Sequence, residues 1–303
     1  MIVAGEPTSL KQETGKKRPD ISVVIANWNT ADLLVRCLWS LRRACLEGVK
    51  LEVIVVDDAS SDDSCQRVQT QFPEVQLLWN ENNRGYAATT NRGAQRASGR
   101  YLLLLNPDTE VTAQALVRLL SFADQHPEAG AVAPRLVYPS GRPQSSVRRF
   151  PTPGTLFLAL MSDCLFLIKN GDYKIHPDRL KEIQEVDQPM ASALLIRRTA
   201  WEQIGGMDES LSLFFNDVDL CWQLRKKGWK IFYIPHAVIV HHHGASTRQL
   251  GIARFILSLK GMLGFYDKNI RPLMASVPYA LLRSLLVVGF YARIIRYLMV
   301  RRG

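Results

Sequence analysis

The chain has 303 residues, of which 47% are hydrophobic and 22% charged, and its formal net charge is +10. This composition excludes a disordered or fibrous protein, and the length allows one large domain or two small ones with a substantial core. The five cysteines include no Cys-x-x-Cys pair. We therefore expect neither a disulfide framework nor a thiolate zinc site, and we expect a reducing, cytoplasmic setting.

The positive charge is concentrated at the end of the chain. From Arg248 onward there are ten basic residues and one acidic residue, Asp267, so this part carries +9 of the total +10. A protein that binds nucleic acid needs Lys and Arg across its whole binding face. Because the rest of the chain is almost neutral, we expect no nucleic-acid partner.

The first half alternates between strand and helix patterns. Residues 1–19 are polar and lack an apolar core of signal-peptide length, so we interpret them as a disordered leader. Strands are predicted at 21–27, 51–56, 75–79 and 101–105, and helices follow the first, third and fourth of these. The alternation predicts an α/β fold with a mostly parallel central sheet and helices on both faces.

Three predicted strands end in polar side chains. Asn27 ends the first strand, Asp57 follows the second, and the buried run 101–105 stops at Asn106 and Asp108. Open α/β sheets bind ligands at the carboxyl edge of their strands. Two roles stay open for Asp57: an acceptor for the imide of a nucleobase, and a plain turn residue.

Asp108 also has two interpretations from the residues alone, a helix N-cap or turn residue and a metal ligand. The first strand is not followed by Gly-x-Gly-x-x-Gly, and the chain has no Gly-x-x-x-x-Gly-Lys-Ser/Thr, so the two common phosphate-binding loops are absent. Without them a diphosphate needs a cation, and a carboxylate-held Mg²⁺ or Mn²⁺ is the natural substitute. We therefore favour Asp108 as a metal ligand.

The second half contains two carboxylates at the start of a predicted helix. A strand is predicted at 190–197, a short helix at 199–206, and a further helix that stops at Gly228. Asp217 and Asp219 fall in the first turn of this last helix, where the helix dipole favours their anionic form. Capping explains one of them, and the other can accept a proton from a hydroxyl nucleophile. We favour Asp217 as the general base over simple capping.

Three adjacent histidines follow the strand-like run 237–240. Neighbouring residues of an extended chain point to opposite sides, so at most two of the three can bind one metal ion. We expect metal ligation at His241, which follows the apolar run directly, and a solvated polar turn at His242 and His243.

Two apolar segments raise the question of membrane contact. Residues 277–300 would pass for a transmembrane span if three arginines did not interrupt them, and arginine at mid-span costs ~2.5 kcal/mol or more. We instead expect 277–303 to lie as a basic amphipathic helix on an anionic membrane surface, with docking on the body or on another subunit as the alternative. The apolar residues at helical spacing are Leu285, Leu286, Phe290, Ile294 and Leu298. Residues 154–168 are too few to span a bilayer. Three roles stay open for them: shaping the entrance to the acceptor site, contacting lipid, and forming a buried core helix.

Six short motifs occur in a familiar order between residues 21 and 247. They are Asn27-Trp28-Asn29, Val56-Asp57-Asp58-Ala59-Ser60, Asn83-Arg84-Gly85-Tyr86-Ala87 with Asn91, Leu105-Asn106-Pro107-Asp108, Asn216-Asp217-Val218-Asp219-Leu220, and His241-x-x-Gly244-x-Ser246. With them the chain resembles the family-two, inverting nucleotide-sugar glycosyltransferases of the A-type fold, in particular the bacterial rhamnosyltransferase-like branch. An ordered set of six motifs is far more specific than any one of them.

The resemblance implies a role for each matching residue. Asp108 stands at the metal ligand of the family's Asp-x-Asp motif, Asp217 aligns with the catalytic Asp, and His241 matches a histidine near the metal and diphosphate. Asn216 stands where the family usually has Glu, and with Asp219 it is a candidate for the acceptor side. The implied nucleotide-binding residues are Asn27, Asn29, Asp57, Arg84, Gly85, Asn91 and Asn106, where Asn106 replaces the first Asp of Asp-x-Asp.

The resemblance also implies the reaction, an inverting, metal-dependent sugar transfer with Mg²⁺ or Mn²⁺. The expected donor is dTDP-L-rhamnose and the expected acceptor a lipid-linked saccharide, in bacterial surface polysaccharide synthesis. The alternative is a galactofuranosyl or hexosyl transferase of the same family that uses a UDP-sugar. We expect a catalytic domain at 20–250, with its nucleotide-binding half at about 20–110 and its acceptor half at about 111–250. The basic tail at 251–303 would hold the protein to the inner face of the plasma membrane or form a homodimer.

Two readings outside the family are disfavoured. A sugar-phosphate nucleotidyltransferase would carry a Gly-rich, basic loop after the first strand, where this chain has Asn27-Trp28-Asn29. A non-enzymatic membrane adaptor would explain the basic tail, but it would not explain the acidic residues at the strand ends.

Overall fold

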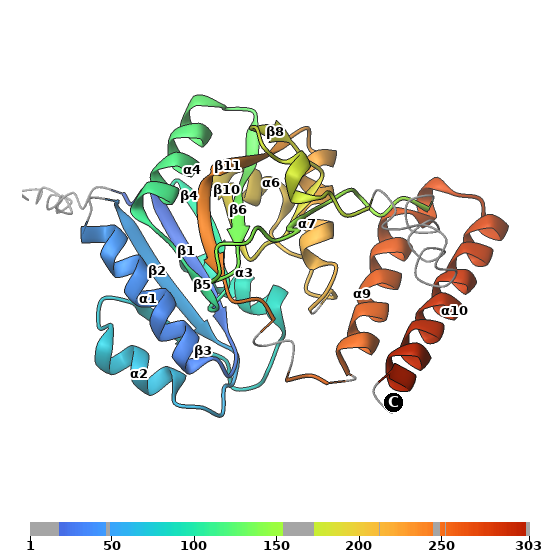
Figure 1. Ribbon diagram of the computed structural model, residues 1–303, viewed down its shortest axis with the longest axis horizontal. Coiled ribbons are helices and arrows are strands. Elements are labelled where there is room, and N and C mark those ends of the chain that lie inside the picture. The colour runs from blue at the N-terminus through green and yellow to red at the C-terminus, as the bar shows by residue number, and fades with distance from the viewer. Residues whose placement is uncertain are drawn as a thin grey trace, which may run out of the picture.

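The fold is known from a computed structural model that describes residues 18–46, 49–153, 173–211, 213–244, 249–251 and 253–300. These residues form a central sheet flanked by helices, with a pair of helices, α9 and α10, beside α7 at the C-terminal end (Figure 1). The strands are β1 Ile21–Asn27, β2 Leu51–Asp57, β3 Gln76–Trp79, β4 Tyr101–Leu105, β5 Thr109–Glu110, β6 Ala129–Val137, β7 Val147–Arg148, β8 Gln184–Glu185, β9 Gln188–Pro189, β10 Ala193–Arg197 and β11 Lys230–His241. The helices are α1 Ala31–Leu46, α2 Ser64–Gln71, α3 Tyr86–Arg96, α4 Ala113–Gln125, α6 Arg198–Ile204, α7 Asn216–Lys226, α9 Ala253–Asn269 and α10 Ser276–Val300, with short 3₁₀ turns η1 Pro177–Arg179 and η2 Arg271–Leu273.

The main sheet has nine strands within the described residues, in the order β3-β2-β1-β4-β10-β6-β11-β5, with β8 paired to β11. The pairs β2–β3, β1–β2, β1–β4 and β6–β11 are parallel, which confirms the predicted mostly parallel sheet. β10 runs antiparallel between β4 and β6. The start of β10 therefore lies at the same edge of the sheet as the ends of β1, β2 and β4, so residues from both halves of the chain meet there.

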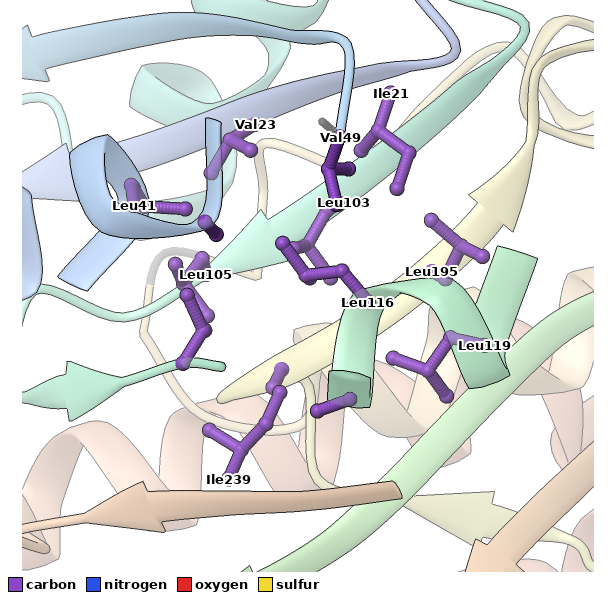
Figure 2. Close-up of a cluster of buried hydrophobic side chains, with 14 of the residues drawn as sticks. Ile21, Val23, Leu41, Val49, Leu103, Leu105, Leu116, Leu119, Leu195 and Ile239 are labelled. Carbon is purple, nitrogen blue, oxygen red and sulfur yellow. The ribbon is translucent and has the colours of Figure 1, made fainter. Parts of the chain in front are cut away.

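The alternation of side chains along the strands divides the core into two layers. One layer contains Val23 and Leu103 and packs against α1, α2 and α4, as Figure 2 shows for Leu41, Leu116 and other labelled residues. The other contains Leu102 and Leu104 and packs against α3, α6 and α7. β4 is buried on both faces, as its run of apolar residues predicted.

The C-terminal helices pack on the helix that carries Asp217. A third apolar cluster joins Val218 of α7 to Phe265 and Tyr266 of α9 and to Leu286 of α10. Helices α9 and α10 are thus attached to α7 by an apolar cluster separate from the two layers beside the sheet. Within the part of the chain that the structure describes, no helix combines the length and apolar character needed to cross a bilayer.

This packing corrects the membrane-facing residues expected from the sequence. Leu286 and Phe290 are 1% and 7% exposed because they face the protein, so they cannot lie in a membrane surface. Leu285 is 52% exposed and belongs to the opposite side of α10. Periodicity alone shows that a helix has an apolar stripe, but it does not show whether protein or lipid covers that stripe.

Three expectations concern residues outside the described part of the chain. They are the segment 154–168, Ser246 of the last motif, and residues 1–17 of the expected leader. The last residue of that leader, Pro19, contacts the body, since its carbonyl oxygen accepts a hydrogen bond of 3.2 Å from the Arg100 N–H.

Candidate functional site

The carboxyl ends of β1 and β2 form the first part of the site. Asn27 and Asp57 are partners in the ladder, and Asn27 Nδ2 donates to Asp57 Oδ1 at 2.7 Å. Ser60 donates to the same carboxylate from its N–H at 2.9 Å and from its hydroxyl at 2.7 Å. Asp57 is 2% exposed. The loop therefore holds the Asp57 carboxylate in one fixed orientation at the sheet edge.

Asn29 connects this loop to the one after β2. Its backbone has φ of 51°, a conformation that asparagine adopts more readily than most residues. Its N–H donates to Ser60 Oγ at 2.9 Å, and its Oδ1 accepts from the Ser61 N–H at 2.7 Å. The side chain that the resemblance assigned to nucleotide binding thus ties two sheet-edge loops together.

Asp58 organises the Arg84–Gly85 turn, a role that the sequence analysis missed. It is 4% exposed and accepts hydrogen bonds from the Arg84 N–H at 2.8 Å, the Gly85 N–H at 2.9 Å and Asn80 Nδ2 at 2.7 Å. Gly85 precedes α3 with φ of 82°, which explains why glycine stands there. A second acidic residue directly after a strand was the signal that could have indicated this turn.

Asn91 and Arg84 contact the loop before α7. Asn91 Nδ2 donates to the Met207 carbonyl at 2.8 Å and to Glu209 at 3.0 Å, and its Oδ1 accepts from the Met207 N–H at 2.9 Å. The Arg84 guanidinium forms an exposed ion pair of 3.3 Å with Glu209. These contacts hold the 205–211 loop against α3, and they differ from the nucleotide contacts that the resemblance implied for both residues.

Asp108 is buried beside His241. The two side chains are 6% and 2% exposed, and His241 Nε2 lies 3.3 Å from Asp108 Oδ1. Thr112 is the N-cap of α4, since its side chain accepts from the Ala115 N–H at 3.1 Å, so Asp108 is not the cap of that helix. The Asp108 carbonyl accepts from the His242 N–H at 2.8 Å, which joins the end of β11 to this loop.

The Asp108 and His241 side chains fit a divalent cation. Two ligand atoms that each lie about 2.1 Å from an ion, with an angle of about 90° between them at the ion, are about 3 Å apart. This is close to the 3.3 Å between His241 Nε2 and Asp108 Oδ1. A carboxylate oxygen and an imidazole nitrogen suit Mn²⁺, and the carboxylate alone suits Mg²⁺. Among the described residues no group of three or more His, Cys, Asp or Glu side chains is placed to hold a metal.

The other two histidines have separate contacts. His242 Nε2 lies 2.9 Å from Glu110 Oε1, outside the pair of Asp108 and His241. The His243 ring stacks on His241 with the ring centres 5.5 Å apart.

Gln144 contacts His241 twice, from its Nε2 to the His241 carbonyl at 2.6 Å and from its Oε1 to His241 Nδ1 at 2.9 Å.

Asn106 links this loop to the start of β10. Its N–H donates to the Ser192 carbonyl at 2.9 Å and its Nδ2 to Ser192 Oγ at 3.2 Å. The preceding residue, Ala191, lies beside the Asp217 carboxylate, since its backbone N–H opposes the rise in the pKa of that group. This chain of contacts places Asp108 and Asp217 at the same edge of the sheet.

Asp217 lies in the first turn of α7, as predicted, but it does not cap the helix. The N-cap residue is Phe215, whose side chain makes no capping hydrogen bond. Asp217 Oδ1 accepts from the Val218 N–H at 2.9 Å, and its Oδ2 accepts from Gln188 Nε2 at 3.1 Å. Burial raises the pKa of Asp217, and the positive charge of Arg148 opposes part of this rise. A carboxylate with a raised pKa is a stronger base than an ordinary one.

Asp219, two residues further on, anchors the C-terminal helices. It is 2% exposed and accepts hydrogen bonds from Lys268 Nζ at 2.8 Å, Asn269 Nδ2 at 2.8 Å and Gln223 Nε2 at 3.0 Å. These contacts argue for an anchoring role in place of the acceptor-side role expected for Asp219. Of the two carboxylates, Asp217 remains as the base candidate.

Asn216 supports the first turn of α7 from within. Its Oδ1 accepts from the Asp217 N–H at 2.8 Å, and it is 4% exposed. Its Nδ2 is buried without a hydrogen-bond partner among the residues that the structure describes. The amide that replaces the family's usual Glu therefore positions the backbone of Asp217.

Three residues near the two carboxylates were absent from the sequence predictions. Gln144, Arg148 and Gln188 lie on or next to β7 and β9, which pair Arg148 with Gln188. These strands have two residues each within the described chain, too few for a periodic pattern. No motif in the sequence marked them.

The fold is that of the A-type glycosyltransferases. The Glycosyl transferase family 2 model matches residues 22–202, so the chain belongs to this family and is a glycosyltransferase. The N-acetylglucosaminyl-diphospho-decaprenol L-rhamnosyltransferase of Mycobacterium tuberculosis is 28% identical over 246 residues, which cover 75% of this chain and 77% of that protein. The low-salt glycan biosynthesis hexosyltransferase Agl10 of Haloferax volcanii is 26% identical and covers 70% of this chain and 64% of its own length.

A solved structure shows the same fold. The mannosyltransferase PcManGT of Pyrobaculum calidifontis, in complex with GDP-Man and Mn²⁺, superimposes with a TM-score of 0.55 at 18% identity and covers 92% of this chain and 76% of that one. The predicted A-type fold is therefore confirmed.

Proposed function

We propose that this glycosyltransferase is inverting and metal-dependent and transfers L-rhamnose from dTDP-L-rhamnose to a hydroxyl of a lipid-linked saccharide in bacterial surface polysaccharide synthesis. The observation that carries the proposal is the buried Asp108–His241 pair at the same sheet edge as Asp217, whose pKa is raised. A cation site and a base at one edge are what a single displacement at an anomeric carbon requires.

Asp108 and His241 would hold Mg²⁺ or Mn²⁺. The bound ion supplies charge stabilisation to the departing nucleoside diphosphate. The role of this chain is to keep the two ligands buried and 3.3 Å apart, so that they need little rearrangement on binding.

Asp217 would accept the proton of the acceptor hydroxyl as that oxygen attacks the anomeric carbon. The hydrogen bond from Gln188 to Oδ2 and that from Val218 to Oδ1 fix the carboxylate plane. Attack from the side opposite the leaving diphosphate inverts the anomeric centre.

Asn27 and Asp57 would lie at the nucleobase. The hydrogen bonds from Asn27 and Ser60 fix the orientation of the Asp57 carboxylate, which suits recognition of an imide N–H. Thymine and uracil share this group, so this contact admits a dTDP-sugar and a UDP-sugar alike. The rhamnosyltransferase relative supports the first donor, and the hexosyltransferase relative is the reason to keep a UDP-hexose as the alternative.

The outer side of α10 would lie on an anionic membrane surface, where a lipid-linked acceptor resides. Five apolar residues on this side are more than half exposed, and their spacing places them along one stripe of the helix, the α10 stripe. They are Val277, Leu281, Leu285, Val288 and Tyr291. The basic residues from Arg248 onward provide the charge that anionic lipid attracts. A second copy of the chain on this stripe is the alternative.

The test is release of nucleoside diphosphate by the purified chain from a panel of dTDP- and UDP-sugars, with Mn²⁺, Mg²⁺ or EDTA. We expect release with dTDP-L-rhamnose that EDTA abolishes, and faster release with a lipid-linked saccharide acceptor. Equal release of nucleoside diphosphate in EDTA would contradict the proposed metal dependence. Release only with UDP-sugars would contradict dTDP-L-rhamnose as the donor and favour the alternative donor class.

A further inference from the structure

Gln144 contacts His241 in a way that fixes the position of its proton. The side-chain amide is 4% exposed and spans the backbone carbonyl and the ring Nδ1 of His241, at 2.6 Å and 2.9 Å. A carbonyl oxygen can only accept a hydrogen bond, so the amide nitrogen of Gln144 must face it. The amide oxygen then faces Nδ1, and Nδ1 must carry a hydrogen to donate to it.

The assignment leaves the other ring nitrogen as an acceptor. In a neutral imidazole with the hydrogen on Nδ1, Nε2 has a lone pair, and here Nε2 lies 3.3 Å from Asp108 Oδ1. Two acceptor atoms at this distance have no hydrogen bond between them. They repel each other unless a cation or a further proton lies between.

Gln144 itself is held rigidly. Its N–H donates to the Leu136 carbonyl at 2.9 Å, and its carbonyl accepts from the Ser146 N–H at 2.9 Å. The preceding turn is closed by a hydrogen bond of 2.9 Å from the Tyr138 N–H to the Arg142 carbonyl. The backbone from which the Gln144 side chain reaches His241 is therefore anchored to the end of β6.

We propose that Gln144 is a positioning residue that keeps the hydrogen of His241 on Nδ1 and so directs the Nε2 lone pair to the cation site. This inference deepens the proposed function, since it rests on Asp108 and His241 as the metal ligands. Without Gln144, the ring gains by moving its hydrogen to Nε2 and donating it to Asp108. That hydrogen bond joins His241 Nε2 to Asp108 Oδ1, so neither atom is then available to bind a cation.

The tautomer can be measured without any metal. In the ¹⁵N-histidine NMR spectrum of the metal-free protein at alkaline pH, with the His241 signals assigned from a His241→Asn variant, we expect the ring hydrogen on Nδ1. A hydrogen on Nε2 in the wild-type protein overturns the proposal, whether or not the protein binds metal. In Gln144→Met we expect the hydrogen to move to Nε2.

Mn²⁺ binding in the presence of dTDP, followed by electron paramagnetic resonance, gives the second readout. Replacing a side chain that orients a metal-bound histidine commonly weakens metal affinity 10–100-fold, and we expect a loss of about that size in Gln144→Met. Gln125→Met is the matched control, because Gln125 is exposed at the end of α4, and it should bind like the wild type. Wild-type affinity in a folded Gln144→Met overturns the proposal.

Gln144→Glu keeps the inference testable if Gln144→Met does not fold. The glutamate retains an acceptor for Nδ1–H, so the hydrogen should stay on Nδ1, and a shift to Nε2 in this variant also contradicts the proposal. Absence of Mn²⁺ binding in the wild-type protein would refute the proposed metal dependence, and the NMR result would still decide the role of Gln144.

Discussion

The Asp217→Asn substitution separates catalysis from folding. The new amide has the same shape, and its oxygen can still accept from the Val218 N–H. Its nitrogen faces the Gln188 nitrogen, so one hydrogen bond worth about 1 kcal/mol is lost. Because burial raises the pKa of Asp217, the ionised carboxylate lowers folding stability at neutral pH, and its removal offsets this loss. We expect the Tm to be unchanged or higher.

The effect on turnover should be large. A positioned general base contributes about 10²–10⁴-fold, equivalent to about 3–5 kcal/mol of the barrier at 1.36 kcal/mol for each tenfold change. We expect kcat to fall by that factor in a transfer assay with donor and acceptor, and calorimetry should give a Kd for dTDP within about threefold of wild type.

Asp219→Asn is the matched control because it changes a carboxylate two residues away on the same helix. It weakens the charge-assisted contact with Lys268, whose side chain is 39% exposed, and we expect a stability loss of about 1.5 kcal/mol. Turnover per folded molecule should stay near wild type. If Asp217→Asn keeps more than a tenth of wild-type kcat or loses its affinity for dTDP, Asp217 is not the general base.

Three further outcomes are expected. Asp108→Asn should abolish Mn²⁺ binding in calorimetry and leave a protein that still melts cooperatively, and retained binding would place the cation elsewhere. The kcat of the wild type should fall as pH drops through the raised pKa of Asp217, so the acidic limb of the pH–rate profile should lie above the ordinary aspartate range, and a limb at or below that range would contradict the assignment. Leu281→Gln with Leu285→Gln should release the protein from anionic vesicles without lowering its Tm, because both side chains are more than half exposed. If the double variant still sediments with vesicles, the α10 stripe is not the anchor, and a change in its oligomeric state by light scattering would favour the homodimer.

Much of the sheet was predictable because its strands are buried on both faces. The run 101–105 was predicted with the bounds that the structure shows, and the helix predicted after it is Ala113–Gln125. A strand that is buried on both faces is apolar along its whole length, so it is easily recognised in the sequence, and polar residues mark its end. The positions of Asp57, Asp108 and Asp217 followed from that pattern and from helix periodicity.

The contacts of the individual site residues were less predictable. Asn29 and Asn91 matched family motifs, yet their side chains tie loops together, and a motif does not say whether an amide faces a ligand or the backbone. Asp219 and Lys268 meet across 49 residues, and such a contact leaves no local signal. Gln144 reaches His241 from the turn after β6, which no spacing rule anticipates.

The central claim is that Asp108 and His241 hold the cation that binds the donor diphosphate. Crystals grown with dTDP and Mn²⁺ and measured at the manganese absorption edge test it most directly. We expect one anomalous peak bonded to the Asp108 carboxylate, to His241 Nε2 and to diphosphate oxygens, at the carboxyl edge of the sheet beside Asp217. A manganese peak elsewhere, or dTDP bound with no peak between these two side chains, would contradict it.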